Sequence, residues 1–185
     1  MPTTALLLMD LQAGILDRFG TDAGFVSRIN AAAEAARSVG LPVLWVKVGF
    51  RHGYPEVSAR NQSFSAVTTS GMFTDTDPGA DLHADLEVRD TDVVVVKKRV
   101  SAFAGSDLDV VLRAAEVDSL VLAGIATSGV VLSTLRQAAD LDFRLIVLAD
   151  GCLDGDEEVH RVLTEKVFPR QAEVTSVEAW TAGLG

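Results

Sequence analysis

The hydrophobic positions of this chain form short apolar runs, separated by stretches in which apolar residues are spaced as in helices. The runs that predict strands cover residues 5–9, 44–48, 93–96, 120–123 and 145–148, with a sixth expected at 173–176. Continuous apolar runs of this length are typical of strands covered on both faces. Between them, steps of three and four, as from Phe25 through Ile29 to Ala32, indicate amphipathic helices. The alternation predicts an α/β fold, a three-layer α/β/α sandwich around a parallel sheet, in one domain spanning residues 1–185.

The most informative stretch is residues 119–150, which read SLVLAGIATSGVVLSTLRQAADLDFRLIVLAD. An apolar run meets Gly124, a helical pattern carrying Val131, Leu135 and Ala138 follows, and a second apolar run ends at Asp150. In open parallel sheets, ligands bind outside the carboxyl ends of the strands. A helix that begins there also presents unpaired N–H groups, which suit an anion or a developing oxyanion. We therefore expect a site near residues 124–129.

Residues 49–82 show little periodicity and are predicted to form a long loop. Loops of this length in compact domains are usually functional or mobile. The stretch carries Phe50, Arg51, Tyr54 and Phe64, which can close over a ligand. Ordinary loop packing or a subunit interface would explain the same residues.

Composition narrows the classes of function. The formal net charge is −10, which disfavours a nucleic-acid partner, because binding to a phosphate backbone needs basic residues. No apolar run approaches the length of a membrane span, so no membrane partner is expected. Cys152 is the single cysteine, which excludes an intrachain disulfide and suits a reducing compartment. No signal peptide precedes the first strand, and we expect a cytoplasmic protein.

Charged residues at the ends of two predicted strands are candidates for chemistry. Asp10 ends the first strand, where apolar surroundings can raise its pKa and make it an acid or base; a turn or helix-capping aspartate is the alternative. Lys97 and Lys98 end the third strand, and strand alternation allows only one of them to face a given site. One of these lysines can pair with Asp10, or both can be solvated residues that discourage edge pairing.

Other chemical motifs are weak. Ser101, Ser128 and Ser133 do not lie in a G-x-S-x-G turn, and the sequence contains no phosphate-binding G-x-G-x-x-G or Walker A loop. Free cysteines such as Cys152 are most often small buried hydrophobes. The three histidines share no metal-ligand spacing.

Three segments together resemble the isochorismatase-like superfamily, also called cysteine hydrolases. They are LLLMDLQ around Asp10, VVVKKRVSAF around Lys97, and LAGIATSGVVLSTLRQAADLDFRLIVLADGC. The resemblance implies a six-stranded parallel sheet in the order 3-2-1-4-5-6 and a triad of Asp, Lys and Cys, in which Asp10 and Lys97 match the first two members. It also implies a cis peptide bond at Ile125–Ala126 and a homodimer or homotetramer.

The third member of the triad departs from the family pattern. In the family the nucleophilic cysteine stands three residues after the threonine that is Thr127 here, and Val130 occupies that position. A valine cannot form an acyl-enzyme intermediate. The family's metal pattern after the second strand is also missing, since only His52 is present there. The resemblance therefore implies no metal and no cofactor.

The resemblance favours a hydrolase of a small, anionic metabolite that works without a cysteine, with Asp10 as acid or base and Lys97 as its charge partner. Backbone groups of Ile125, Ala126 and Val130 would stabilise an oxyanion. The predicted substrate pocket comprises Phe50, Arg51, Tyr54, Phe64, Phe103 and Thr127. The alternative is a catalytically inactive member that binds a small molecule or supports assembly. A third possibility is an amidase that recruits Cys152 or Ser128.

Overall fold

The computed structural model describes residues 3–20 and 23–184 and is built around one parallel sheet. Its strands are β1 (Thr3–Met9), β2 (Val43–Val48), β3 (Val93–Lys97), β4 (Val117–Ile125), β5 (Arg144–Leu153) and β6 (Glu173–Thr175). Each neighbouring pair is parallel, in the order β3-β2-β1-β4-β5-β6. The predicted sheet and strand order are confirmed.

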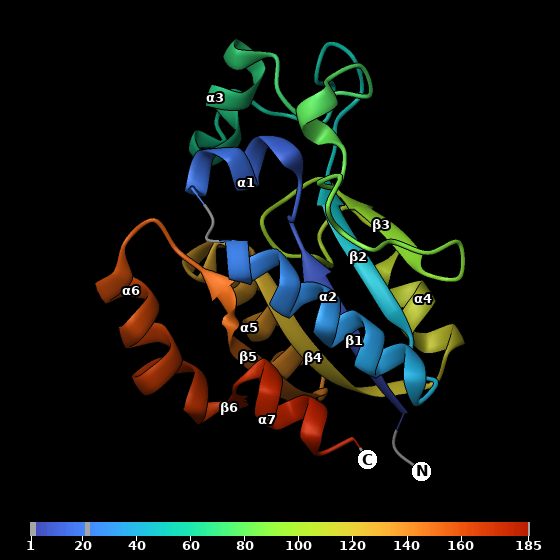
Figure 1. Ribbon diagram of the computed structural model, residues 1–185. Helices are drawn as coiled ribbons and strands as arrows, with labels where there is room; N and C mark the ends of the chain where they lie inside the picture. The colour runs from blue at the N-terminus through green and yellow to red at the C-terminus, as the bar shows by residue number, and fades with distance from the viewer. Residues whose placement is uncertain (1–2, 21–22, 185) are drawn as a thin grey trace.

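Helices cover both faces of this sheet, as Figure 1 shows, with α2 and α7 on one side and α4 and α5 on the other. The helices are α1 (Ala13–Phe19), α2 (Ala23–Ser38), α3 (Gln62–Ser70), α4 (Leu108–Ala114), α5 (Leu132–Asp140), α6 (Glu157–Val162) and α7 (Val177–Ala182). Shorter turns are η1 (Pro78–Ala80), η2 (Thr127–Val131), η3 (Leu163–Val167) and η4 (Phe168–Arg170). Within the described ranges, no helix has the length and apolarity needed to cross a membrane.

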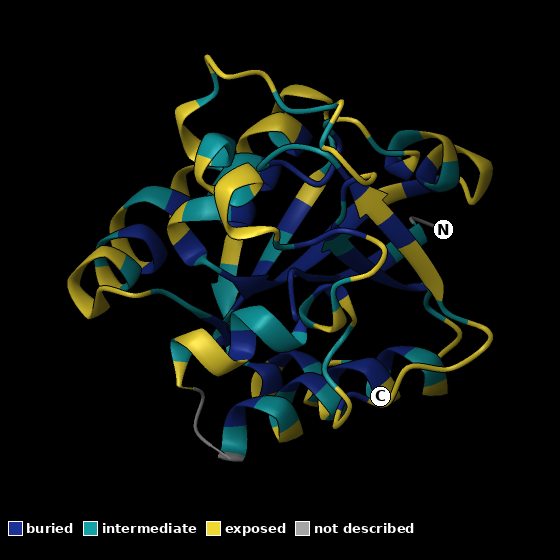
Figure 2. Cartoon of the chain, turned by 90° about the horizontal axis from the view of Figure 1, so that it is seen from above, coloured by how far each residue is buried: buried dark blue, intermediate teal, exposed yellow. Residues whose placement is uncertain are grey.

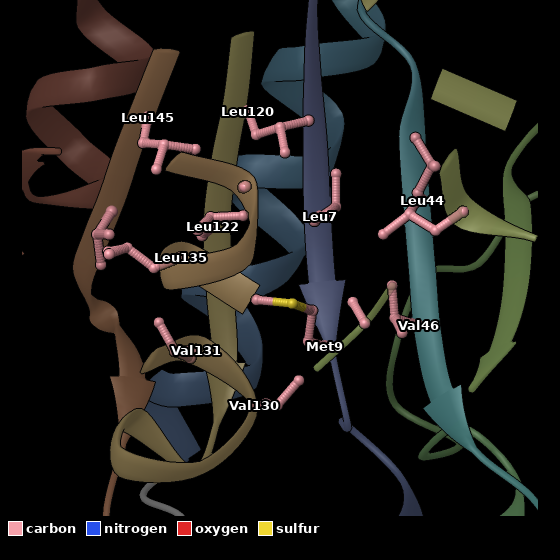
Figure 3. Close-up of a cluster of buried hydrophobic side chains, with 14 of the residues drawn as sticks. Leu7, Met9, Leu44, Val46, Leu120, Leu122, Val130, Val131, Leu135 and Leu145 are labelled. Carbon is pink, nitrogen blue, oxygen red and sulfur yellow. The ribbon is translucent and has the colours of Figure 1, made fainter. Parts of the chain in front are cut away.

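The core consists of two apolar layers, one on each face of the sheet. Alternation along β1 sends Leu7 and Met9 into the layer under α4 and α5, and Leu6 and Leu8 into the layer under α2. All four side chains are fully buried. Figure 3 shows the first layer, and Figure 2 shows buried residues concentrated along the central strands. Burial on both faces explains why the strands appear in the sequence as unbroken apolar runs.

β4 and β5 extend beyond their apolar runs, because backbone pairing continues past them. Gly124 pairs with Cys152, so Cys152 lies within β5, whereas the sequence predicted that it would follow that strand. Gly124 also has φ of +145°, and a Cβ there would lie 2.2 Å from the Met9 carbonyl oxygen. Only glycine lets β1 and β4 approach this closely at the edge where the site is expected.

Two helices that the sequence pattern did not predict, α1 and α3, lie above the carboxyl ends of the strands (Figure 1). α1 has seven residues and α3 has nine, so neither is long enough to show a clear helical pattern. The segment predicted as a loop is held by long-range bonds: the Phe50 N–H donates to the Phe73 carbonyl at 2.8 Å, and the Tyr54 hydroxyl donates to the Met72 carbonyl at 2.8 Å.

A buried polar network ties α2 to the β3 edge of the sheet. The Asp92 carboxylate accepts from the Arg37 guanidinium, from Trp45 Nε1 at 2.9 Å and from the Arg89 N–H at 3.0 Å. The Arg37 and Asp92 side chains are only 10% and 2% exposed. Desolvation alone would raise the pKa of Asp92, but the bonds from Arg37, Trp45 and Arg89 outweigh it and hold that pKa below its usual range.

We expect Asp92→Ala to lower the free energy of unfolding by about 3–5 kcal/mol, because it leaves a buried guanidinium without its partner. Since the folded-state pKa of Asp92 is lowered, its contribution is present above the ordinary aspartate pKa and is lost as the pH falls. Denaturant unfolding at several pH values measures both effects. Asp90→Ala, at an exposed neighbouring position, is the control, and equal losses in the two variants would contradict the role given to the network.

Candidate active site

A buried ion pair lies at the carboxyl edge of the sheet. Lys97 Nζ is 2.9 Å from Asp10 Oδ2, and the two side chains are 2% and 10% exposed. Of the two alternatives for the lysines, the structure shows pairing with Asp10, and it is Lys97, not Lys98, that reaches Asp10.

The pair spans two strand spacings. β1 and β3 are separated by β2, so their backbones are roughly 9–10 Å apart. Lys97 pairs in register with Val48 of β2, while the Asp10 N–H donates to the Val46 carbonyl at 2.7 Å. The long lysine side chain therefore reaches past the end of β2 to the residue that follows β1.

Lys97 has no donor left over for a ligand. Its ammonium carries three N–H donors, and it contacts Asp10, the Arg99 carbonyl at 3.0 Å and the Val100 carbonyl at 3.1 Å. Lys97 therefore holds and neutralises Asp10.

Asp10 keeps one oxygen unpaired. Its Oδ1 is buried and has no hydrogen-bond partner among the described residues. Burial raises the pKa of Asp10 above its usual range, and the Lys97 ammonium opposes this shift without cancelling it. Asp10 also has φ of +57°, a left-handed conformation that aspartate and asparagine tolerate better than most residues. The free oxygen and the raised pKa are properties of a group that can donate or accept a proton.

The turn η2 follows β4 beside this pair and is anchored by α6 and the segment before it. The Ile125–Ala126 peptide is cis, as the family resemblance implied. The hydroxyl of Thr127, which is fully buried, lies 2.8 Å from His160 Nδ1, and the Ser128 N–H donates to Asp154 Oδ2 at 2.7 Å. No local pattern in the sequence could indicate these contacts, because the partners are 33 and 26 residues apart.

Val130 is packed into hydrocarbon. It is 2% exposed and belongs to the apolar layer that contains Met9, Val46 and Phe103. Figure 3 shows its side chain pointing toward Met9 and Val46 below the end of β1. Val130, at the position that the resemblance assigns to a nucleophile, therefore lies next to Met9, the residue before Asp10. Its side chain presents only methyl groups there.

The segment after Lys97 is fastened to α5. The Ser101 hydroxyl donates to Gln137 Oε1 at 2.7 Å, and the Ala102 N–H donates to Thr134 Oγ1 at 2.9 Å. Phe103 then packs at 6.1 Å between ring centres from Phe143. This brings Phe103 into the same apolar layer as Val130.

Gln12 is a buried polar residue that the sequence analysis did not single out. Its Nε2 donates to the Val48 and Ala80 carbonyls at 2.9 and 2.8 Å, and its Oε1 accepts from the Val48 N–H at 2.9 Å. The side chain is fully buried. Gln12 thereby locks the segment after β1 to the end of β2, which positions Asp10. The only signal for it was its place in the LLLMDLQ segment.

The predicted pocket residues separate into groups. Phe50, Tyr54 and Phe64 form an aromatic cluster, with ring centres of Phe50 5.8 and 5.6 Å from the other two. Arg51 is exposed and pairs with Glu56 at 2.7 Å. This cluster is distinct from the apolar layer of Val130 and Phe103.

Cys152 is unsuited to nucleophilic chemistry. It is 1% exposed, and burial raises the pKa of its thiol to about 12. The thiolate, which is the reactive form, is therefore scarce at neutral pH. Within the described part of the chain, no three His, Cys, Asp or Glu side chains are grouped so that they could hold a metal ion.

The chain is similar to known proteins along nearly its whole length. The Isochorismatase domain model matches residues 4–179. The uncharacterized isochorismatase family protein YecD of Escherichia coli O157:H7 is 36% identical over 182 residues, covering 95% of this chain and 93% of its own. The ureidoacrylate amidohydrolase RutB of Methylobacterium radiotolerans is 34% identical and covers 99% and 80%. An isochorismatase family protein of Burkholderia thailandensis superposes with a TM-score of 0.87 at 28% identity, covering 100% and 96%.

We expect Lys97→Met to lower the free energy of unfolding by about 3–5 kcal/mol at neutral pH, because it leaves the Asp10 carboxylate buried without its partner. The folded-state pKa of Asp10 is already raised, and loss of Lys97 raises it further. The folded protein then binds more protons than the unfolded chain over a wider pH window, so stability falls as the pH rises through that window. Denaturant unfolding across pH measures this slope.

The double variant Lys97→Met/Asp10→Asn is the matched control, since it removes both charges. It should regain stability at neutral pH relative to Lys97→Met and lose the added pH dependence. An identical deficit in both variants at every pH would show that Lys97 acts through packing and not through the carboxylate.

Proposed function

The chain belongs to the isochorismatase family, and we propose that it hydrolyses a small anionic metabolite without a cysteine nucleophile, with Asp10 as the acid–base group and Lys97 as its charge partner. The observation that carries this proposal is the unpaired Oδ1 of Asp10, a buried carboxylate oxygen beside a fully engaged lysine. A buried oxygen with no internal partner is available to a substrate or to a water molecule.

A thiol-free route is supported by what surrounds the site. Val130 supplies no nucleophile, and the single cysteine, Cys152, is buried with its pKa at about 12. We therefore assign the chemistry to proton transfer by Asp10. Its raised pKa increases the fraction of carboxylic acid near neutral pH, which favours donation of a proton.

A vinyl ether is one substrate that such a site can hydrolyse. Asp10 would donate its proton to the vinyl carbon, and water would add to the resulting oxocarbenium carbon. A proton of that water would return to the Asp10 carboxylate as the hemiketal splits into a carbonyl compound and an alcohol. The step needs one acid and one water molecule and forms no covalent enzyme intermediate.

The amidohydrolase named among the relatives suggests a second substrate class, small carboxylates that carry a ureido or amide group. There the Asp10 carboxylate would act as a base toward water, and the backbone of Ile125, Ala126 and Val130 would face the developing oxyanion. In both classes the substrate's own negative charge would have to be recognised by groups other than Lys97, whose donors are occupied.

The second candidate is a catalytically inactive member that binds a small molecule. It is favoured by the closure of the site in the single chain, where Asp10, Lys97 and Val130 are 7%, 2% and 2% exposed. A substrate could reach Asp10 only after surrounding side chains move.

Asp10→Asn separates these two functions, because it removes the acid at nearly constant shape and suits the positive φ. We expect turnover to fall about 10²–10⁴-fold, the usual contribution of general acid–base catalysis. The assay is hydrolysis of a panel of small vinyl ethers, ureido acids, amides and esters, followed for each compound by chromatography. Asp17→Asn, at an exposed position, should match the wild type.

Val130→Cys completes the test by restoring a thiol at the family position. We expect it not to raise turnover of the substrate that the wild type prefers. If the wild type hydrolyses nothing in the panel while Val130→Cys gains amidase activity, the protein is a binding member of the family and the proposed hydrolase function is wrong.

Cys152 should be dispensable. We expect Cys152→Ala, and treatment of the wild type with a thiol-alkylating reagent, to leave turnover within about twofold, because a thiol this deeply buried and this weakly acidic takes no part in the reaction. A hundredfold loss in Cys152→Ala, at unchanged thermal stability, would restore a thiol mechanism.

A further inference from the structure

A cavity lies beside Lys98, the neighbour of Lys97 whose side chain alternation places on the other side of β3. Its volume is about 330 Å³, within the range of small-molecule sites. The end of β2, the segment after it, residues 73–75 and the end of β3 form its walls. Two of the predicted pocket residues, Phe50 and Arg51, line this cavity, whereas Asp10, Lys97 and Val130 do not. The cavity is therefore separate from the buried ion pair.

The walls combine an apolar surface with positive charge. Phe73 and Val96 supply hydrocarbon, while Lys47, Arg51 and Lys98 are cationic and Asp75 is the one acidic lining residue. The chain as a whole carries a net charge of −10. The Lys98 ammonium beside this hydrocarbon is suited to an anion that has an apolar body.

Lys98 is the cation with donors available. Its Nζ donates to the Gly49 carbonyl at 2.6 Å, and among the described residues it has no carboxylate partner. Two of its three N–H groups are therefore unassigned. In contrast, Lys47 lies 3.4 Å from Asp81 and Arg51 lies 2.7 Å from Glu56.

We propose that this cavity binds a small organic carboxylate, with Lys98 as the ion-pair partner of the carboxylate and with Phe73 and Val96 against the apolar body. Val96 is 36% exposed and can pack against a bound apolar group.

Benzoate and its neutral isostere benzamide test the charge requirement, with hexanoate and phenylacetate as further carboxylates. Titration is followed by ¹H–¹⁵N NMR, which reports where each compound binds. We expect benzoate to shift the amides of Gly49, Thr74, Val96 and Lys98, and benzamide to bind at least tenfold more weakly. The proposal is overturned if none of the three carboxylates shifts these amides, or if the shifts appear instead at residues 127–129.

Two variants assign the contacts. Lys98→Met removes the charge at similar length and should weaken benzoate binding about 10–100-fold, as expected for a charge-assisted hydrogen bond. Lys166→Met, an exposed lysine elsewhere, should not change it. Val96→Phe should abolish binding by filling the cavity while Lys98 is retained. Unchanged benzoate affinity in Lys98→Met would overturn the proposal.

This test is independent of the proposed hydrolase function. Asp10→Asn should bind benzoate as the wild type does, and an inactive protein should still show the same NMR shifts. Loss of benzoate binding in Asp10→Asn, with its spectrum otherwise native, would assign the carboxylate to the active site and refute a separate cavity site.

Discussion

The candidate active site at the carboxyl edge of the sheet depends on one buried ion pair, between Lys97 and Asp10. An ammonium group removed from water is costly unless it is paired and hydrogen-bonded. Lys97 meets that condition with one carboxylate and two backbone carbonyls. All of these partners must be in place at once, so the ends of β1 and β3 and the segment after Lys97 are held in one geometry. Gln12, in the segment after β1, supports the same geometry through its hydrogen bonds to Val48 of β2.

In the proposed function, Lys97 acts through Asp10 and does not contact the substrate itself. The lysine makes a buried carboxylate tolerable, while desolvation still raises its pKa. These opposing effects act on a carboxylate that keeps one oxygen unpaired among the described residues. Val130 adds an apolar wall beside it and lowers the local polarity further. An acid–base function fits this environment better than a nucleophilic one.

Two adjacent lysines at the end of β3 have different surroundings. Lys97 is sequestered in the interior, whereas Lys98 lies in a cavity and donates to the Gly49 carbonyl. The two side chains carry the same charge, yet one has all its donors occupied and the other does not. Interior hydrogen bonding therefore decides which lysine is structural and which is available to a ligand.

The sequence by itself determined the sheet and half of the site. Unbroken apolar runs such as that of β1 can be recognised locally, because burial on both faces demands them. The family resemblance implied that Asp10 and Lys97 belong to one site, and it pointed to Val130 as the residue at the position of the family's cysteine. The helices α1 and α3 were too short for periodicity to indicate them.

Only the tertiary structure decided how these residues are used. The bonds of Thr127 to His160 and of Gln12 to Val48 and Ala80 join residues 33 to 68 positions apart, so no local pattern announces them. Several segments distant in sequence meet around these lysines, where they occupy all three N–H donors of Lys97 and form the cavity beside Lys98. How deeply a side chain is buried and which groups it bonds depend on how distant segments pack together. A linear pattern of residue types does not carry that information.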